Sequence, residues 1–330
     1  MPEPKRILVN GFGRVGRALF RLLEQHSEAQ VVAINDPLPA DQLAYLLKYD
    51  TVMGRFSGEI GVDGNTLVVN GRPILLSHNG MLTSADGCDV VLNSSGRNNT
   101  RENLEGILDH GAKRVVVSKP LDRGVCDRTV LMGVNHDALK KEDRILSAGS
   151  CTAHCYTPLI KLIHERWPVV RGYMMTVHAY TSAQNVVDGG HDTDPRRGRA
   201  AASNIVPTTT ESLSAFEQVM PELAGRITGM AQRVPVVNGS NVELVLEVRG
   251  RPHTDEVNDA VRECPDYKGI IEYSEDPLVS SDIVGNPHSA IFDSRLTHAT
   301  TAETTLIRAI AWYDNEWGYS NRLAELICTL

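Results

Sequence analysis

The 330-residue sequence contains no apolar run near the ~20 residues that a membrane-spanning helix requires. Its N-terminus leads directly into a predicted strand and lacks the pattern of a secretory signal peptide. Positive charge is not in excess either, because the net charge is −8, which argues against a general nucleic-acid surface. We therefore expect a cytoplasmic protein that binds neither membranes nor nucleic acids.

Cysteine is sparse, and the sequence shows no internal repeat, low-complexity stretch or linker. Six cysteines scattered over this length do not form a disulfide framework and indicate a reducing compartment. Cys151 and Cys155 are spaced as two zinc ligands would be, but no matching Cys/His pair occurs elsewhere, so no metal site is predicted. What remains is an ordinary globular composition, 42% hydrophobic and 22% charged, with a length typical of about two domains.

The first half of the sequence alternates short apolar strands with helices. Predicted strands cover residues 6–10, 30–35, 89–93 and 114–118, and predicted helices cover residues 17–25 and 102–110. Such alternation is typical of an α/β domain with a doubly wound parallel sheet of the Rossmann type.

The second half has a different pattern, because its strands recur without regular helical crossovers. Predicted strands cover residues 172–177, 229–235, 240–248 and 304–313, and predicted helices cover residues 212–220 and 254–263. This pattern predicts an α+β domain with a mixed or antiparallel sheet and helices on one face. A loop at 188–199, rich in Gly, Asp and Arg, is long enough to be functional.

A glycine fingerprint follows the first predicted strand. Gly11 allows a tight turn, Gly13 lets the backbone approach a pyrophosphate, and Gly16 lets helix and strand pack closely. Asp36 ends the second strand, where an acid bonds the ribose hydroxyls of NAD and repels the 2′-phosphate of NADP. Such a motif alone is often only a turn, but here the order strand–turn–helix–strand–Asp favours an NAD site.

Cys151 lies among small residues just before an apolar helical run. The free N–H groups and partial positive charge of a helix N-terminus stabilise a thiolate. His178 lies at the end of a later apolar strand, so the two residues are candidates for a nucleophile and its base. The alternatives are a buried structural thiol, a role that Cys155 fits better, and a core histidine whose hydrogen bonds are satisfied.

Five further segments carry a family resemblance. They are residues 7–17, 44–50 (AYLLKYD), 54–56 (GRF), 281–289 (SDIVGNPHS) and 312–322 (WYDNEWGYSNR). Together they resemble the phosphorylating, NAD-linked glyceraldehyde-3-phosphate dehydrogenases, essentially from end to end.

The resemblance implies an NAD-binding domain at residues 1–150, completed by a C-terminal helix at about 315–330, and a catalytic domain at 151–314. It also implies a homotetramer that uses NAD, a small phosphorylated aldehyde and inorganic phosphate. Cys151 would attack the aldehyde to give a thiohemiacetal, and His178 would hold the thiolate and take the hydroxyl proton as hydride leaves for NAD. Phosphate would then cleave the resulting thioester, which for glyceraldehyde 3-phosphate gives 1,3-bisphosphoglycerate.

The same resemblance assigns binding residues. The cofactor would be bound by Gly11, Phe12, Gly13, Arg14, Val15, Gly16, Asp36, Ser95, Gly96, Ser118, Asn315 and Tyr319. Of these, Asn315 would orient the nicotinamide amide, with Tyr319 beside it. The phosphate of the substrate would be bound by Thr181 and Arg233, and the attacking phosphate by Ser150, Thr152 and Thr210.

The sequence also departs from the family at the second phosphate site, because Glu211 follows Thr210 where the family has glycine. A carboxylate ~6 Å from a phosphate would repel it by on the order of 3 kcal/mol per charge pair at an effective dielectric of about 20. An outward-facing Glu211 would be screened by water and salt instead. Other departures are Ala148, Ala153, His154 and Ala183, which replace polar residues, and Lys119, which replaces alanine.

Three hypotheses follow. The first is a phosphorylating glyceraldehyde-3-phosphate dehydrogenase. The second is a dehydrogenase of another phosphorylated aldehyde, such as erythrose 4-phosphate, in which water cleaves the thioester. The third is a catalytically silent NAD-binding or interaction protein, against which the presence of both Cys151 and His178 argues.

Overall fold

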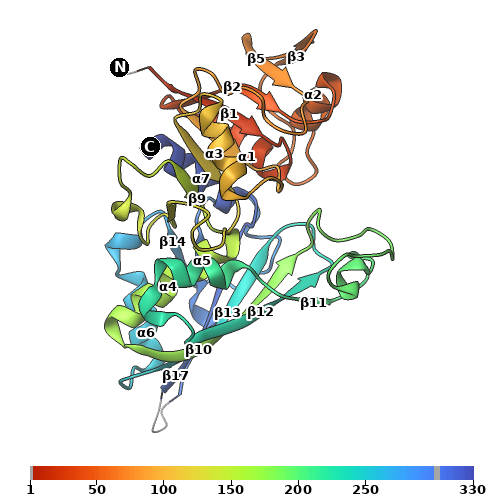
Figure 1. Cartoon of the computed structure of the whole chain (residues 1–330). Helices are drawn as coiled ribbons and strands as arrows, with labels where there is room; N and C mark the ends of the chain where they lie inside the picture. Colours follow the sequence, from red (N-terminus) through yellow and green to blue (C-terminus); the bar gives the residue numbers. More distant parts are fainter. Residues whose placement is uncertain (1–2, 301–304) are drawn as a thin grey trace. The chain divides into compact units, whose positions relative to one another are not determined.

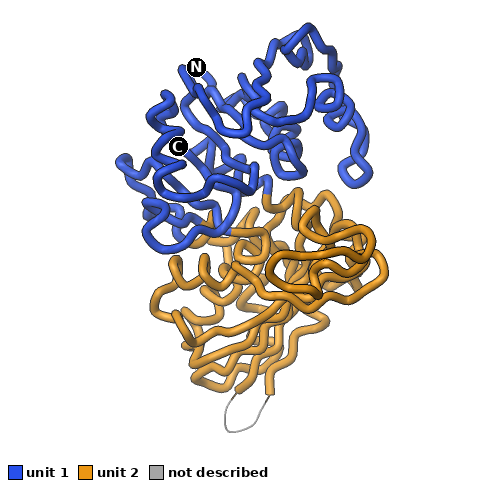
Figure 2. The backbone as a smooth tube through the Cα atoms, turned by 45° about the vertical axis from the view of Figure 1, so that its right-hand side comes forward, with its two compact units in different colours: residues 1–130, 135–149, 320–330 blue, residues 131–134, 150–319 orange. Residues whose placement is uncertain are grey.

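The computed structural model describes residues 3–300 and 305–330 of the chain. The chain forms two compact units, which Figure 2 distinguishes by colour. The first contains residues up to 130, 135–149 and 320–330, and the second contains residues 131–134 and 150–319. No helix among the described residues is long and apolar enough to cross a membrane.

The first unit is built on a nine-stranded sheet with the strand order β3-β4-β5-β2-β1-β6-β7-β9-β8. Strands from β5 to β8 in this order pair in parallel, and β3, β4 and β5 pair antiparallel at one edge. The predicted doubly wound parallel sheet is therefore confirmed. The elements are β1 (Lys5–Asn10), α1 (Arg14–Leu23), β2 (Ala29–Asn35), α2 (Ala40–Lys48), β3 (Ile60–Asp63), β4 (Thr66–Val69), β5 (Arg72–Ser77), β6 (Val90–Asn93), α3 (Arg101–Asp109), β7 (Arg114–Val117), β8 (Arg128–Thr129), η1 (His136–Ala138) and β9 (Ile145–Ser147).

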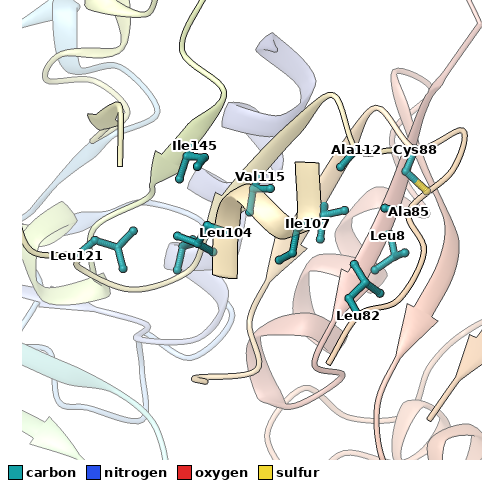
Figure 3. Packing of buried hydrophobic residues seen from close by; sticks show 12 residues of the cluster. Leu8, Leu82, Ala85, Cys88, Leu104, Ile107, Ala112, Val115, Leu121 and Ile145 are labelled. Carbon is teal, nitrogen blue, oxygen red and sulfur yellow. The ribbon is translucent and has the colours of Figure 1, made fainter. Parts of the chain in front are cut away.

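Aliphatic side chains on both faces of the central strands explain why this sheet is parallel and covered. Every residue of β6 is buried, as expected for a strand with helices or loops on each side. Leu104 and Ile107 of α3 pack with Val115 of β7 and Ile145 of β9 in one buried cluster (Figure 3). The cluster joins helix α3 to the sheet.

Helix α1 begins at Arg14 rather than at the predicted residue 17. Gly13 is its N-cap residue, and Gly16 lies in its first turn. These residues give no apolar periodicity, so the sequence pattern becomes helical only from Ala18 onward. The difference matters because it places the first N–H groups of the helix inside the glycine fingerprint.

The second unit contains an eight-stranded mixed sheet, whose main path runs β11-β12-β10-β13-β17-β15-β14, with β16 paired to β17. β10 pairs in parallel with β12 and antiparallel with β13, which confirms the predicted mixed sheet. Its elements are α4 (Cys151–Arg166), β10 (Val169–Ala179), η2 (Pro195–Gly198), β11 (Val206–Thr208), α5 (Ser212–Val219), η3 (Pro221–Leu223), β12 (Ile227–Val234), β13 (Ser240–Val248), α6 (Thr254–Arg262), η4 (Pro265–Tyr267), β14 (Ile271–Ser274), β15 (Ala290–Asp293), η5 (Ser294–Leu296), β16 (His298–Ala299) and β17 (Thr305–Tyr313). The last helix, α7 (Trp317–Thr329), begins in the second unit and continues in the first from residue 320 onward. Residue 304, where the last strand was predicted to begin, lies outside the described residues.

Helix α4 lies against this sheet, in contact with β10, β13 and β17, and α5 and α6 pack beside it (Figure 1). Along β13, buried and half-buried residues alternate strictly, because one face of the strand meets the helices and the other does not. The helices therefore cover one face of the sheet, as the sequence predicts. This packing brings the first turn of α4 to the end of β10, where the candidate catalytic residues meet.

Candidate active site

Cys151 is the first residue of α4, as predicted. Ser150 caps the helix, because its Oγ accepts a hydrogen bond of 3.1 Å from the backbone N–H of Ala153. No acidic residue lies in the first turn to neutralise the partial positive charge of the helix terminus. The sulfur of Cys151 therefore lies in a setting that favours negative charge, apart from its burial.

His178 is the penultimate residue of strand β10, and its ring points at that sulfur. Its Nε2 is 3.5 Å from Sγ of Cys151, so the two residues separated in sequence form the predicted pair. The carbonyl oxygen of Ala179 lies 2.7 Å from Nδ1 of His178 and also accepts a hydrogen bond of 3.0 Å from Nη1 of Arg233. Nη1 of Arg233 also lies 2.6 Å from Nδ1. Donation from Nδ1 to Ala179 places the ring hydrogen on Nδ1, and donation from Arg233 to Nδ1 places it on Nε2. The first tautomer leaves Nε2 as an acceptor facing the thiol, and it is the form that a base at this position requires.

The protonation of the pair follows from burial and from one nearby charge. Burial, together with the Arg233 guanidinium, lowers the pKa of His178 to about 3. Burial also raises the pKa of the Cys151 thiol, although Arg233 and hydrogen bonds from Thr152 oppose that shift. At neutral pH the resting pair is therefore a thiol and a neutral imidazole. This differs from the resting thiolate held by His178 that the sequence comparison implies.

The hydroxyl of Thr152 lies between the sulfur of Cys151, 3.9 Å away, and a chain of hydroxyl groups. Thr176 donates to the carbonyl of Asn241 at 2.9 Å, so the hydroxyl of Tyr313 donates to Thr176 at 2.9 Å. The oxygen of Tyr313 then accepts from Thr152, also at 2.9 Å. The hydroxyl of Thr152 thus supports the tyrosine, whose ring packs edge-on 5.8 Å from that of His178.

Two guanidinium groups provide donors for an anion. Nε of Arg233 and Nε of Arg197 are buried and have no hydrogen-bond partner among the described residues. Burial lowers the pKa of Arg233, whereas Cys151 and Tyr313 oppose that shift. Arg197 lies close enough to lower this pKa a little further. Thr181 binds Gln184 through its N–H and hydroxyl, at 2.9 and 3.1 Å from Oε1. Arg197 lies in the loop noted for its length, but no sequence signal singled it out for a phosphate site.

Thr210 and Glu211 lie at the start of α5. Thr210 Oγ1 accepts from the N–H of Ser212 at 3.2 Å and lies 2.9 Å from its hydroxyl, so Thr210 shapes the entry to the helix. Glu211 is exposed, and its carboxylate is not buried beside a binding site. Water and salt screen an exposed charge strongly. Such screening would weaken any repulsion between Glu211 and an incoming phosphate.

His154, which replaces the asparagine of the family pattern, is buried one turn into α4. Its Nδ1 lies 3.1 Å from the carbonyl of Ser150, and its Nε2 accepts from the N–H of Met132 at 3.3 Å. Its ring meets the ring of Tyr319 at 5.7 Å. His154 therefore joins the capping residue of α4 to Tyr319, which the resemblance places beside the nicotinamide.

The glycine turn of the first unit has the shape that a pyrophosphate requires. A side chain on Gly11 would lie 2.6 Å from Cα of Ser95, and one on Gly16 would lie 2.4 Å from the carbonyl oxygen of Gly11. A Cβ on Gly13, in contrast, would meet nothing within 4 Å. Helix α1 begins there, and no side chain caps its first turn, which includes Val15.

Asp36 holds this turn to the end of β2. Its carboxylate accepts from the N–H of Phe12 at 2.8 Å and from the N–H of Leu38 at 3.0 Å. The side chain of Phe12 is in the core, and that of Arg14 pairs with Asp50. Any contact that Phe12 and Arg14 make with a pyrophosphate therefore comes from their backbones.

Three buried asparagines, which sequence reasoning missed, join the strand ends beside the turn. Asn35 donates to Asn10 at 2.7 Å, and Asn10 donates to Asn93 at 3.0 Å. Ser95 and Ser118 both bind Asn93, the first through its side chain at 2.8 Å and the second through its N–H to the backbone at 3.1 Å. Gly96 follows with φ +72°. The ladder brings the predicted cofactor residues after β1, β2, β6 and β7 to one edge of the sheet.

Two parts of the chain match models of the same known family. Residues 5–101 match the model of the glyceraldehyde 3-phosphate dehydrogenase NAD binding domain, and residues 150–315 match that of its C-terminal domain. The chain belongs to the glyceraldehyde-3-phosphate dehydrogenase family. The cofactor of this family's N-terminal domain, NAD, agrees with the open glycine turn and with Asp36.

Curated members of the family are similar over nearly their whole length. The glyceraldehyde-3-phosphate dehydrogenase of Kitasatospora aureofaciens is 47% identical over 330 residues, covering 98% of both chains. Those of Geobacillus stearothermophilus and Mycobacterium tuberculosis are both 42% identical, covering 97% and 98% of this chain and 96% and 97% of theirs.

The glycine turn yields a prediction with a built-in control. Gly16→Ala should destabilise the fold by about 1–3 kcal/mol, because its Cβ would overlap the Gly11 carbonyl. Gly13→Ala should leave stability nearly unchanged but weaken NAD binding, because its methyl group would occupy the open space. Thermal unfolding and calorimetric NAD titration of both variants test this. Intact NAD affinity in Gly13→Ala would remove the pyrophosphate from this turn.

The buried, neutral His178 predicts a pH dependence of stability. Its pKa is about 3 in the fold and near 6.5 when unfolded, so the unfolded chain binds the extra proton between these values. The contribution of neutral His178 to the free energy of unfolding is complete above pH 6.5. It is lost as the pH falls, by about 2 kcal/mol between pH 7 and 5. Denaturant unfolding of the wild type should show this fall in the free energy of unfolding between pH 7 and 5. In His178→Asn the fall should be about 2 kcal/mol smaller. Equal pH dependence in both proteins would show that His178 titrates normally.

Proposed function

We propose that this protein is a phosphorylating, NAD-dependent glyceraldehyde-3-phosphate dehydrogenase. It oxidises D-glyceraldehyde 3-phosphate with inorganic phosphate to 1,3-bisphosphoglycerate. The observation that carries the proposal is the 3.5 Å approach of Nε2 of His178 to Sγ of Cys151 at the start of α4, in a chain of this family. We assign NAD binding to the first domain and catalysis to the second.

In the first step, Sγ of Cys151 attacks the aldehyde carbon, and the thiol proton passes to Nε2 of His178. Only a neutral imidazole can accept that proton, because its Nε2 then carries a free lone pair. The proton then moves to the carbonyl oxygen, which becomes the hydroxyl group of a thiohemiacetal. The N–H groups at the start of α4 stabilise negative charge on the sulfur during the attack.

In the second step, His178 takes the hydroxyl proton while hydride leaves the same carbon, and a thioester remains on Cys151. NAD, when bound, supplies the hydride acceptor. A phosphate oxygen then attacks the thioester carbon, the carbon–sulfur bond breaks, and His178 returns its proton to the sulfur. One aldehyde is oxidised, one NAD is reduced, and the free thiol is restored.

The cationic groups favour phosphorylated substrates and a phosphate acceptor. The unpaired Nε atoms of Arg233 and Arg197 offer charge-assisted donors, and a guanidinium suits a phosphate geometrically. We assign the substrate phosphate to Arg233 and to Thr181, whose hydroxyl would exchange its hydrogen bond to Gln184 for one to the anion. We assign the attacking phosphate to Thr210, Ser150 and the backbone of Thr152. The hydrolytic alternative is not favoured, because Glu211 is exposed and the relatives are glyceraldehyde-3-phosphate dehydrogenases.

We further propose that the protein is a cytoplasmic homotetramer acting in glycolysis. The face of the second sheet opposite its helices supports an oligomer. It exposes Tyr173 on β10 and Leu306 on β17, with exposed fractions of 38% and 42%. Apolar side chains of this size on an open sheet face are typical of contact surfaces between subunits.

The nucleophile is tested by a matched pair of variants. Cys151→Ser should abolish NADH formation while leaving the fold and NAD binding intact, because only Cys151 faces His178. Cys155→Ser should keep substantial activity, because Cys155 is fully buried and its thiol faces the carbonyl of Ala311. Steady-state rates with D-glyceraldehyde 3-phosphate decide the matter. Equal loss in the two variants would refute the assignment.

The acyl acceptor is tested at Glu211. Because this side chain is exposed, Glu211→Gly should leave the dependence of the rate on phosphate unchanged, and Glu211→Gln should behave in the same way. Stability should fall by roughly 0.5 kcal/mol, because an acid near the start of α5 is lost. Rates measured against phosphate concentration are the readout. A severalfold fall in the apparent KM for phosphate would show that the carboxylate opposes the incoming anion.

A further inference from the structure

Ser240 occupies a junction between the candidate base and the end of β17. It is the first residue of β13, it is fully buried, and it pairs in register with Tyr313. Its hydroxyl oxygen accepts from the backbone N–H of Ala179 at 3.1 Å. Its hydroxyl hydrogen is donated to Oδ1 of Asn315 at 2.8 Å.

The number of available hydrogens fixes which group donates and which accepts in these two hydrogen bonds. A backbone N–H can only donate, so Ser240 must be the acceptor toward Ala179. Its single hydrogen then goes to Asn315, and the hydroxyl has no other partner among the described residues. Asn315 must therefore present its amide oxygen to Ser240. A flipped amide would place two N–H groups against that oxygen and leave the serine hydrogen without an acceptor.

This orientation of the amide decides what Nδ2 of Asn315 can bind. With Oδ1 engaged by Ser240, Nδ2 of Asn315 points away, and it is not among the buried atoms that lack a partner. Asn315 therefore offers a hydrogen-bond donor to whatever it meets. A group recognised there must supply an acceptor, such as a carbonyl oxygen.

The same serine also acts on the residue that orients the base. Ala179 uses its N–H for Ser240 and its carbonyl for Nδ1 of His178. One short segment thus connects the orientation of the imidazole with the orientation of the Asn315 amide. A change at Ser240 therefore reaches Asn315 directly and His178 through Ala179.

We propose that Ser240 is a positioning residue that holds Asn315 as a hydrogen-bond donor toward the carbonyl of the nicotinamide carboxamide. The inference rests on the proposed function, because it takes the nicotinamide as the group that Asn315 meets. Under this arrangement the carboxamide N–H groups are not needed at Asn315. Recognition depends on the carbonyl alone, and the serine sets this preference.

The test compares NAD with 3-acetylpyridine adenine dinucleotide, which keeps the carbonyl acceptor and lacks the amide N–H groups. The wild type should bind both. In Ser240→Ala the Asn315 amide is free to flip and to accept from the carboxamide of NAD, a compensation that the acetyl analogue does not offer. The ratio of the analogue's Kd to that of NAD, from calorimetry, should therefore rise about fivefold, equivalent to one hydrogen bond.

Ser294→Ala is the matched control, because it removes a buried serine bond of 2.7 Å, to the carbonyl of Ser274, that does not involve Asn315. Its ratio should equal that of the wild type. Adding Ser240→Ala to Asn315→Ala should not change the ratio further. Equal weakening of both dinucleotides in Ser240→Ala, or the same shift in the control, would overturn the proposal.

Turnover separates this inference from the proposed function. If the wild type binds both dinucleotides but forms no NADH from D-glyceraldehyde 3-phosphate, the proposed reaction fails and the binding ratio still decides the role of Ser240. If turnover is normal and the ratio does not move, the reaction stands and Ser240 has no such role.

Discussion

The carbonyl oxygen of Ala179 is the acceptor on which the catalytic geometry depends. It receives hydrogen bonds from Nδ1 of His178 and from Arg233. The first contact holds the ring with Nε2 toward the sulfur of Cys151. The second places a cation beside the ring, where it adds to the burial that lowers the pKa of His178. Because β10 and β12 run in parallel with His178 opposite Arg233, the sheet register itself sets this arrangement.

Backbone groups fixed by buried polar side chains recur in both units. In the first unit, Asp36 binds the N–H of Phe12, and the ladder of Asn10, Asn35 and Asn93 joins the ends of three strands. In the second unit, Ser240 holds the N–H of Ala179. In each case a buried polar residue has its hydrogen bonds satisfied and, through them, orients the group that would meet a ligand.

Local patterns predicted the two sheets, the glycine turn and the helix start at Cys151, because each depends on neighbours in sequence. The strands β3 to β5 and β14 to β16 were not predicted, since strands this short give weak periodicity. The roles of Arg197 and Ser240 could not be predicted, because they arise from pairings between distant strands and loops. The directions of the pKa shifts at Cys151 and His178 could not be predicted for a related reason: the sequence reveals the helix N-terminus but not the burial that raises the first pKa and lowers the second.

The most direct test of this account is to trap the acyl intermediate. The protein would be mixed with D-glyceraldehyde 3-phosphate and NAD in phosphate-free buffer, quenched in acid and analysed by intact and peptide mass spectrometry. The account predicts one 3-phosphoglyceroyl group per chain, located on Cys151, one NADH formed per group, and loss of the group when phosphate is added before the quench. An acyl group on another cysteine, or NADH formation without any acyl group on Cys151, would contradict it.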